Sequence, residues 1–199
     1  MTTAAQMNNT VRTAARSDDG NHDKFLTFCL GREEYGLPIL AVREIIGLID
    51  VTPLPQTPDY VKGVINLRGK IIPVIELRSK FGLPTVAYTA ETCILVVEVD
   101  SGDEGSSSGG GGSFQLGIIV DSVREVLDIS RSSIEPPPNF GSSIPLSAIQ
   151  GMGKVKDKVV ILLNINSVGA KQGLEKIADD AAGSGIAAAD PVNELRVAA

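Results

Sequence analysis

The stretch Tyr60–Gly82, YVKGVINLRGKIIPVIELRSKFG, decides the fold of this chain. Its second half predicts a strand over Lys70–Leu77, because apolar residues occupy both alternating faces. One face carries Ile71, Pro73, Ile75 and Leu77, and the other carries Ile72, Val74 and Glu76. A strand of this kind should be covered on both sides. Since proline lacks an N–H group, Pro73 favours an edge or a bulge over the centre of a sheet. Before the strand, Thr57 and Pro58 favour a single helical turn near Tyr60.

Arg68 is the unusual residue of this stretch, since it stands between Leu67 and Gly69 in mostly apolar surroundings. A charge beside a conformationally permissive glycine, next to a buried strand, indicates a surface that contacts a partner. A solvated surface charge is the alternative interpretation.

The rest of the chain predicts a series of short strands. Lys24–Leu30 and Glu34–Ile39 should form a hairpin around the turn Gly31–Glu34. Helical spacing of apolar residues favours a short helix over Ile39–Ile46. The further strands expected are Leu48–Leu54, Thr92–Val99, Phe114–Val120 and Lys158–Ile165.

Three segments have the composition of tails or linkers. Residues 1–23 are polar without periodicity, and 169–199 are rich in alanine, with a short helix favoured near Leu174–Ala182. Asp100–Ser113, DSGDEGSSSGGGGS, predicts a flexible loop at the tip of a long hairpin. Its glycine run lacks the Gly-Lys-Ser/Thr ending of a phosphate loop.

Composition excludes several classes of function. The chain has 199 residues, a net charge of −6, three tyrosines, five phenylalanines and no tryptophan. The acidic charge disfavours nucleic-acid binding, which requires a basic surface. No apolar run approaches the ~20 residues of a transmembrane helix, and MTTAAQMNNT lacks the apolar core of a secretory signal. Cys29 and Cys93 lie in apolar strand-like runs, which indicates free thiols in a reducing cytoplasm.

Residues for catalysis or cofactor binding are sparse. The chain's one histidine, His22, falls in the expected N-terminal tail, without neighbours to make a triad. One histidine and two cysteines, widely separated, do not suit a closed zinc site. Glu33 and Glu34 belong to a turn, where solvation explains them, and Asp121 and Asp128 suit surface caps. We therefore expect no enzyme, no metal and no cofactor.

An internal repeat divides the central part of the chain into two similar β units. Val42–Ile46 aligns with Val123–Leu127, and Lys70–Leu77 aligns with Lys158–Ile165. Gly36 and Gly63 align with Gly117 and Gly151 in the same manner. Short strands in repeated units suit small barrels, although chance alignment of apolar runs is the alternative. The copies differ at Asn66–Gly69, which faces Lys154–Asp157, so this position is a candidate site.

The same motifs resemble the CheW family of chemotaxis coupling proteins. The resemblance covers roughly Lys24–Val168. The matching runs are Gly31–Leu37, Val42–Ile45, Gly63–Gly69, Ile72–Val74, Leu77-Arg78, Gly117–Val123 and Ile149–Gly151. The loop Asp100–Ser113 departs from the family pattern.

The resemblance implies an all-β fold of two small five-stranded β-barrel subdomains with short helices. They would span roughly 24–90 and 91–168, and because barrels of this family exchange strands, neither need be contiguous in sequence. It also implies a non-enzymatic adaptor, which couples the helical cytoplasmic tips of methyl-accepting chemoreceptors to the regulatory domain of a CheA-type histidine kinase. The adaptor would be cytoplasmic and would reach membrane receptor arrays through its partners, without inserting into the membrane itself.

The binding residues expected for receptor or kinase surround a groove between the barrels. They are Val42, Glu44, Gly63, Val64, Asn66, Leu67, Arg68, Gly69, Val96 and Val97. Core packing explains Val96 and Val97 equally well. We also expect Glu44 and Arg68 to form an ion pair at the mouth of the groove, with Arg43 pointing off that face.

Two alternatives remain from the sequence. A small-barrel enzyme or ligand-binding protein would require converging polar residues, which the sequence does not display. A related chemosensory scaffold, such as the adaptor half of a CheV protein or a detached kinase regulatory domain, is the closer alternative. A CheV protein would need a receiver domain after residue ~170, for which the remaining residues are too few.

Overall fold

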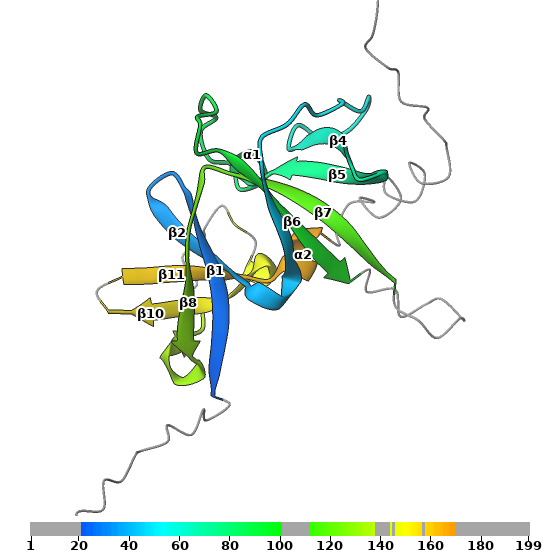
Figure 1. Cartoon of the computed structure of the whole chain (residues 1–199). Coiled ribbons are helices and arrows are strands. Elements are labelled where there is room, and N and C mark those ends of the chain that lie inside the picture. Colours follow the sequence, from blue (N-terminus) through cyan, green and yellow to red (C-terminus); the bar gives the residue numbers. More distant parts are fainter. Residues whose placement is uncertain (1–20, 101–111, 138–143, 145, 157, 170–199) are drawn as a thin grey trace, which may run out of the picture.

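The structure, a computed structural model, describes residues 21–100, 112–137, 144, 146–156 and 158–169. Its strands form two sheets that lie against each other (Figure 1). The short helical segments are η1 (Ile39–Ala41), α1 (Leu77–Lys80), η2 (Arg131–Ser133), η3 (Leu146–Ala148) and α2 (Ile165–Gly169). None of the helices in the described part of the chain is long and apolar enough to cross a membrane.

The six-stranded sheet, called sheet A here, has the order β8-β1-β2-β11-β10-β9. Its strands are β1 (His22–Leu30), β2 (Glu33–Pro38), β8 (Ser122–Ser130), β9 (Ile134–Glu135), β10 (Ile149–Val155) and β11 (Lys158–Leu163). The pairs are antiparallel except for β2 and β11, which run parallel.

The five-stranded sheet, called sheet B, has the order β3-β6-β7-β5-β4. Its strands are β3 (Val42–Gly47), β4 (Val61–Leu67), β5 (Lys70–Glu76), β6 (Cys93–Asp100) and β7 (Ser113–Val120). Its one parallel pair is β5 with β7.

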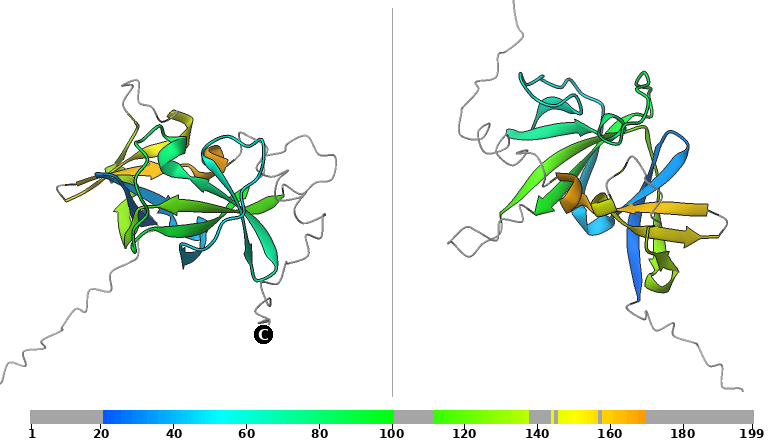
Figure 2. Two further views of the ribbon diagram at one scale, coloured as in Figure 1. Left: turned by 90° about the horizontal axis from the view of Figure 1, so that it is seen from above. Right: turned by 180° about the vertical axis from the view of Figure 1, so that it is seen from behind.

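The internal repeat is confirmed, and its two copies exchange strands. Sheet A joins β1 and β2 to β8, β10 and β11 of the second copy, while sheet B joins β6 and β7 to β3, β4 and β5 of the first. Strands far apart in sequence therefore lie side by side in all views (Figure 2). The aligned glycines occupy equivalent places, since Gly36 lies opposite Leu162 and Gly117 lies opposite Val74.

Three buried clusters hold the sheets together. The largest lies between them and takes side chains from both, including Phe28 and Tyr35 of sheet A and Leu95 of sheet B. The Tyr35 ring lies 5.9 Å from the Phe28 ring and 6.0 Å from the Phe81 ring. Each large apolar side chain buried here stabilises the fold by about 1.5–3 kcal/mol. Smaller clusters belong to sheet B (Ile65, Ile72, Val74, Ile94, Val96, Ile119) and to sheet A (Phe25, Ile129, Val160, Leu162).

The expected all-β fold with two β subdomains and short helices is confirmed, but the barrels are not closed. Within the described strands, the first and last members of each sheet order do not pair with each other. Sheet B is nevertheless curved, because Ile46 of β3 and Leu67 of β4 pack against the same small cluster from opposite edges. In sheet A, Leu127 of β8 and Ile134 of β9 likewise pack against one cluster from opposite edges, so each sheet is open and curved.

Most expected strands are confirmed. They are Lys24–Leu30, Glu34–Ile39, Lys70–Leu77, Thr92–Val99, Phe114–Val120 and Lys158–Ile165, which correspond to β1, β2, β5, β6, β7 and β11. The hairpin flanking the glycine-rich loop is also confirmed, since Asp100 pairs with Ser113. Residues 101–111 of that loop, residues 1–20 and the helix expected near Leu174–Ala182 lie outside the described residues.

The helix expected over Ile39–Ile46 is wrong. Only Ile39–Ala41 forms a 3-10 turn, and Val42–Gly47 forms β3. Burial alternates along β3 between half-buried and exposed residues, which is the period of a strand. Pairing with β6 outweighs the helical spacing of the apolar residues, since branched isoleucine and valine suit a strand.

The strand expected over Leu48–Leu54 is also wrong, since within it Thr52 alone pairs, with Val64. Pro53 and Pro55 have no N–H with which to extend a ladder. The helical turn expected near Tyr60 is a simple turn closed by the Val61 N–H donating to the Pro58 carbonyl.

Two smaller expectations require correction. Pro73 does not lie on an edge strand, because β5 is paired on both sides. The parallel pairing with β7 begins one residue later, at Val74, so the missing N–H interrupts no rung there. His22 and Asp23, assigned to the N-terminal tail, belong to β1, where His22 pairs with Ser130 of β8.

Candidate functional site

The expected ion pair between Glu44 and Arg68 is confirmed. Arg68 Nη2 donates to Glu44 Oε1 at 2.7 Å. Glu44 lies on β3 and Arg68 on the turn that follows β4, and β3 and β4 are the two edge strands of sheet B. The ion pair therefore connects the edges that backbone hydrogen bonds leave apart. The Arg68 side chain is 78% exposed and remains accessible to a partner.

The β4–β5 turn fixes the position of Arg68. Leu67 pairs with Lys70, so Arg68 and Gly69 are the two turn residues. Their φ angles are 54° and 84°, as a two-residue hairpin turn of type I′ requires. Asn66 Oδ1 accepts a hydrogen bond from the Gly69 N–H at 2.9 Å, which holds the turn closed. The turn geometry thus accounts for Asn66 and Gly69, whereas it does not itself favour arginine at position 68.

Gly63 positions the segment that precedes the turn. It lies at a register shift in the β4–β5 pairing, with φ of 137°. A Cβ at Gly63 would lie 1.9 Å from the carbonyl oxygen of Thr52. Glycine is therefore required for the segment around Thr52 to pack on β4, where Thr52 and Val64 exchange two hydrogen bonds of 2.9 Å.

The ten candidate residues divide by exposure. Glu44, Asn66, Leu67, Arg68 and Gly69 form one accessible or half-buried surface, and Val42 lies half-buried on the same strand as Glu44. Gly63 and Val64 are buried beneath it. Val96 and Val97, with exposures of 1% and 0%, belong to the core and have no surface with which to contact a partner. They support β3 from below, since Glu44 pairs with Val96 and Val42 with Val97.

A groove of about 480 Å³ lies where η1 and β6 approach α2. Leu40, Ala41 and Ile165 supply apolar lining, and Leu40 is 88% exposed. As expected, Arg43 points away from the Glu44 face, and it forms an ion pair with Glu98 in this groove. The sequence reasoning missed Leu40, Ile165 and Glu98. The proline that ends β2 before Leu40 was the one available signal, since it marks the start of a turn.

A buried carboxylate supports β5 behind the candidate surface. Glu76 accepts hydrogen bonds from Ser79 Oγ at 2.6 Å and Tyr88 Oη at 3.0 Å, and Lys62 Nζ lies 3.0 Å away. Burial by itself raises the pKa of the Glu76 carboxyl, but these contacts outweigh it, and the pKa lies below its ordinary value. Burial and the nearby carboxylate raise the pKa of Tyr88 to about 12. Glu76 is therefore a structural anion.

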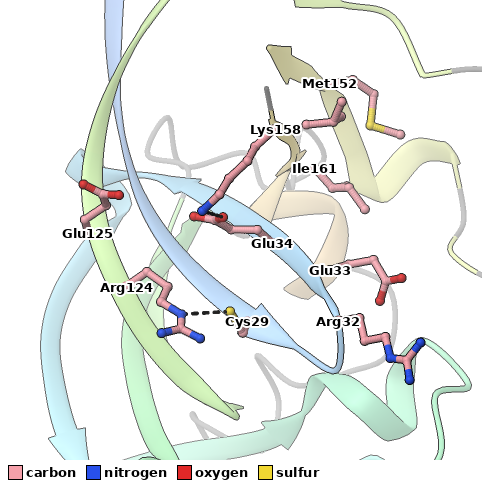
Figure 3. A pocket seen from close by; sticks show the side chains of 10 residues that line it. Cys29, Arg32, Glu33, Glu34, Arg124, Glu125, Met152, Lys158 and Ile161 are labelled. Atoms are coloured by element: carbon pink, nitrogen blue, oxygen red, sulfur yellow. Dashed lines mark hydrogen bonds and ion pairs between the residues drawn. The ribbon is translucent and has the colours of Figure 1, made fainter. Parts of the chain in front are cut away.

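On sheet A, a pocket of about 870 Å³ lies beside Glu125, the residue that the repeat aligns with Glu44 (Figure 3). Arg124 Nε donates to Cys29 Sγ at 3.2 Å, and Lys158 Nζ lies 3.7 Å from Glu34. By the repeat, Glu125 and Lys156 correspond to Glu44 and Arg68, and Lys156 has a φ of 53°. Within the described residues, however, Glu125 and Lys156 form no ion pair with each other. The ion pair of sheet B thus has no counterpart at the corresponding residues of sheet A, where the two edges meet through the apolar side chains of Ile129 and Ile134.

The two curved sheets, the exposed ion pair and the apolar groove belong to an all-β domain with accessible polar and apolar surface. Residues 24–172 match the sequence model described as the CheW-like domain. The chain is 38% identical over 145 residues to a chemotaxis protein CheW from Klebsiella aerogenes, which covers 73% of this chain and 80% of that protein. It therefore belongs to the CheW-like domain family of chemotaxis proteins.

Two further relatives agree with this assignment. The solved structure of the scaffolding protein TtCheW from Thermoanaerobacter tengcongensis matches with a TM-score of 0.64 and 36% identity, over 76% of this chain and 90% of that one. A chemotaxis protein CheV3 from Helicobacter pylori is more distant, with 28% identity over 137 residues, and the match spans 40% of that protein.

Proposed function

We propose that this chain is a non-enzymatic adaptor that couples the cytoplasmic tips of chemoreceptors to the regulatory domain of a CheA-type histidine kinase. It would work in the cytoplasm, held at membrane receptor arrays by its partners. The observation that carries the proposal is the exposed Glu44–Arg68 ion pair at the edge of sheet B, beside half-buried apolar residues. Family membership supplies the setting in chemotaxis signalling.

A receptor tip suits the groove between the sheets. An α-helix with its side chains is about 10–12 Å wide, and an amphipathic helix binds by placing an apolar face in such a groove. Leu40 and Ile165 offer apolar contact, while Arg43 and Glu98 offer charges at the rim. These features favour a helix with apolar residues along one face and charged residues beside that face.

The kinase regulatory domain suits the edge of sheet B. By the family resemblance that domain is itself CheW-like, so the end of one sheet would pack on the end of another. The segment around β3 exposes three aliphatic side chains, Ile45, Leu48 and Ile49, at 48%, 37% and 42%. Clustered exposed aliphatic residues of this kind mark protein interaction surfaces.

Direct binding tests the proposal. The full chain is titrated with a soluble receptor-tip fragment and, separately, with the kinase regulatory domain. We expect both to bind, and Arg68→Ala to weaken at least one interaction several-fold while the unfolding midpoint stays nearly unchanged. Lys156→Ala is the matched control, because Lys156 has the same backbone conformation at the equivalent turn of sheet A. Wild-type affinity of Arg68→Ala for both partners would refute the role assigned to the sheet B edge.

A further inference from the structure

Asp121 stands where the chain passes from sheet B to sheet A, between β7 and β8. Its N–H donates to the Cys29 carbonyl at 3.2 Å. Its carboxylate oxygen Oδ2 accepts a hydrogen bond of 2.7 Å from the Gly31 N–H, in the β1–β2 turn. Asp121 is therefore fixed to sheet A by both its backbone and its side chain.

Arg78 binds the same carboxylate from the side of sheet B, since it lies on α1 directly after β5. Its Nε donates to Asp121 Oδ1 at 2.6 Å and its Nη2 to Oδ2 at 2.5 Å. The third nitrogen, Nη1, donates to the Pro84 carbonyl at 2.8 Å. The Arg78 side chain is 11% exposed and that of Asp121 27% exposed, so solvent screens this pair less than a surface ion pair.

The residue that the repeat aligns with Arg78 also joins the two sheets, but through a carboxylate that is not the repeat equivalent of Asp121. Asn166 of α2 aligns with Arg78 of α1, and it bonds Asp100 at the end of β6. Asn166 Nδ2 donates to Asp100 Oδ2 at 3.0 Å, and the Asp100 N–H donates to Asn166 Oδ1 at 3.1 Å. Two polar contacts therefore join sheet A to sheet B. A bidentate ion pair lies at the crossing from β7 to β8, and an amide–carboxylate contact lies at the end of β6.

The central apolar cluster alone does not determine the angle between the sheets. Apolar burial is non-directional, and packed elements can slide by small shear movements. A guanidinium fork on a carboxylate, in contrast, is satisfied in one relative orientation. The Arg78–Asp121 contact thus supplies the stronger of the two directional restraints that the cluster lacks.

We propose that Arg78 and Asp121 are positioning residues that fix the angle between sheet A and sheet B. They thereby place the receptor-binding and kinase-binding surfaces for simultaneous use, a consequence that rests on the adaptor function proposed above. Neither residue needs to touch a partner. Their loss should affect the assembly of three components more than the binding of either partner alone.

A distance measurement tests the angle without any partner. Spin labels are attached at Lys70→Cys on β5 and Val159→Cys on β11, in a chain that also carries Cys29→Ser and Cys93→Ala. Arg78→Lys keeps the charge but removes the fork, so we expect a distance distribution about two-fold broader than with Arg78 present. Arg131→Lys is the control, because Arg131 binds Asp23 in the same bidentate manner, at 2.9 and 3.0 Å, without joining the two sheets.

Assembly tests the consequence for function. For Arg78→Lys, the dissociation constant of each single partner should change by no more than about two-fold. Receptor-dependent kinase stimulation through the adaptor should fall about ten-fold or more, because simultaneous engagement depends on geometry. Asp121→Asn, which keeps the oxygen that accepts from Gly31, should behave in the same way and provides a second variant if Arg78→Lys folds poorly.

The outcomes separate the two proposals. An unchanged distance distribution in both variants would overturn the positioning role, whatever the partners do. A broadened distribution with undiminished kinase stimulation would overturn the functional consequence. Failure of the wild-type chain to bind either partner would refute the adaptor proposal and leave the distance result standing.

Discussion

Replacing Gly63 with alanine should be the most damaging single-methyl change at the candidate site. The new Cβ would lie 1.9 Å from the Thr52 carbonyl oxygen, 2.6 Å from its carbon and 2.8 Å from the Pro53 Cα. All three are backbone atoms, so no side chain can rotate away to make room. Either the Thr52–Pro53 segment or β4 must move.

The magnitude follows from two contributions. Holding a non-glycine residue at a φ of 137° costs about 1–3 kcal/mol. Displacing the segment around Thr52 breaks the two hydrogen bonds between Thr52 and Val64, each of which contributes about 0.5–1.5 kcal/mol. The free energy of unfolding should fall by about 2–6 kcal/mol, which lowers the midpoint of a domain this size by about 5–20 °C.

Thermal unfolding followed by circular dichroism measures the effect against two matched glycines. Gly47→Ala should be nearly neutral, since nothing lies within 4 Å of its added Cβ and its φ is unremarkable. Gly69→Ala meets equally open space but sits at a φ of 84°, so it should cost about 1 kcal/mol of strain alone. If Gly63→Ala unfolds at the same temperature as Gly47→Ala, the close approach at Thr52 does not exist as described.

Four further outcomes are expected. In a double-mutant cycle, reversing the charge of Arg68 should be partly rescued by reversing Glu44, with a coupling of about 0.5–1 kcal/mol in partner binding; strict additivity would show that the ion pair has no role there. Replacing residues 101–112 by an Asn-Gly turn, which keeps the paired Asp100 and Ser113, should lower the unfolding midpoint by less than about 5 °C, because loop length costs little, and a larger drop would show that the loop packs on the domain. Because hydrogen bonds from Arg78 hold the pKa of Asp121 below its ordinary value, this carboxylate contributes stability that is fully present above about pH 4 and is lost as the pH falls through the lowered pKa. Asp121→Asn should therefore lose less stability than wild type between about pH 4 and pH 2, and parallel acid-unfolding curves would contradict this. Incubation with an active CheA-type kinase and labelled ATP should leave the chain unlabelled, whereas stoichiometric label would contradict a purely non-catalytic adaptor.

Much of the architecture was predictable because the apolar pattern is strong where strands are covered on both faces. The β5 segment and its aligned partner β11 each carry apolar residues on both alternating faces, and both lie in the interior of their sheets. The Glu44–Arg68 pair was predictable because complementary charges flank segments that belong to one repeat unit. Charge complementarity alone does not decide the contact, since the equivalent residues Glu125 and Lys156 are also oppositely charged and form no ion pair with each other in the structure.

The errors have a common cause in pairing between distant strands. The β3 residues, Val42–Gly47, have helical spacing of apolar side chains, and only their partner β6 decides that they form a strand. Val96 and Val97 lie on that partner strand, and the burial of their side chains leaves them no surface at which to contact a partner. The contact of Arg78 with Asp121 was missed for the same reason, since it depends on where the chain crosses between sheets. The signal available was that each charge directly follows an apolar strand.

The exchange of strands between the two copies also determines when the domain can form during synthesis. The β1–β2 hairpin leaves the ribosome first, yet its neighbours β8 and β11 come from the second half of the chain. At 5–20 residues per second, the wait lasts on the order of ten seconds. Until β8 emerges, both outer edges of the hairpin carry unpaired backbone groups, and the edge of β2 stays unpaired until β11 follows. Such unpaired groups are the ones that pair with other chains in aggregation. The nascent chain is therefore most vulnerable before its final strands emerge, and cleavage between the two copies would leave neither half able to complete its own sheet.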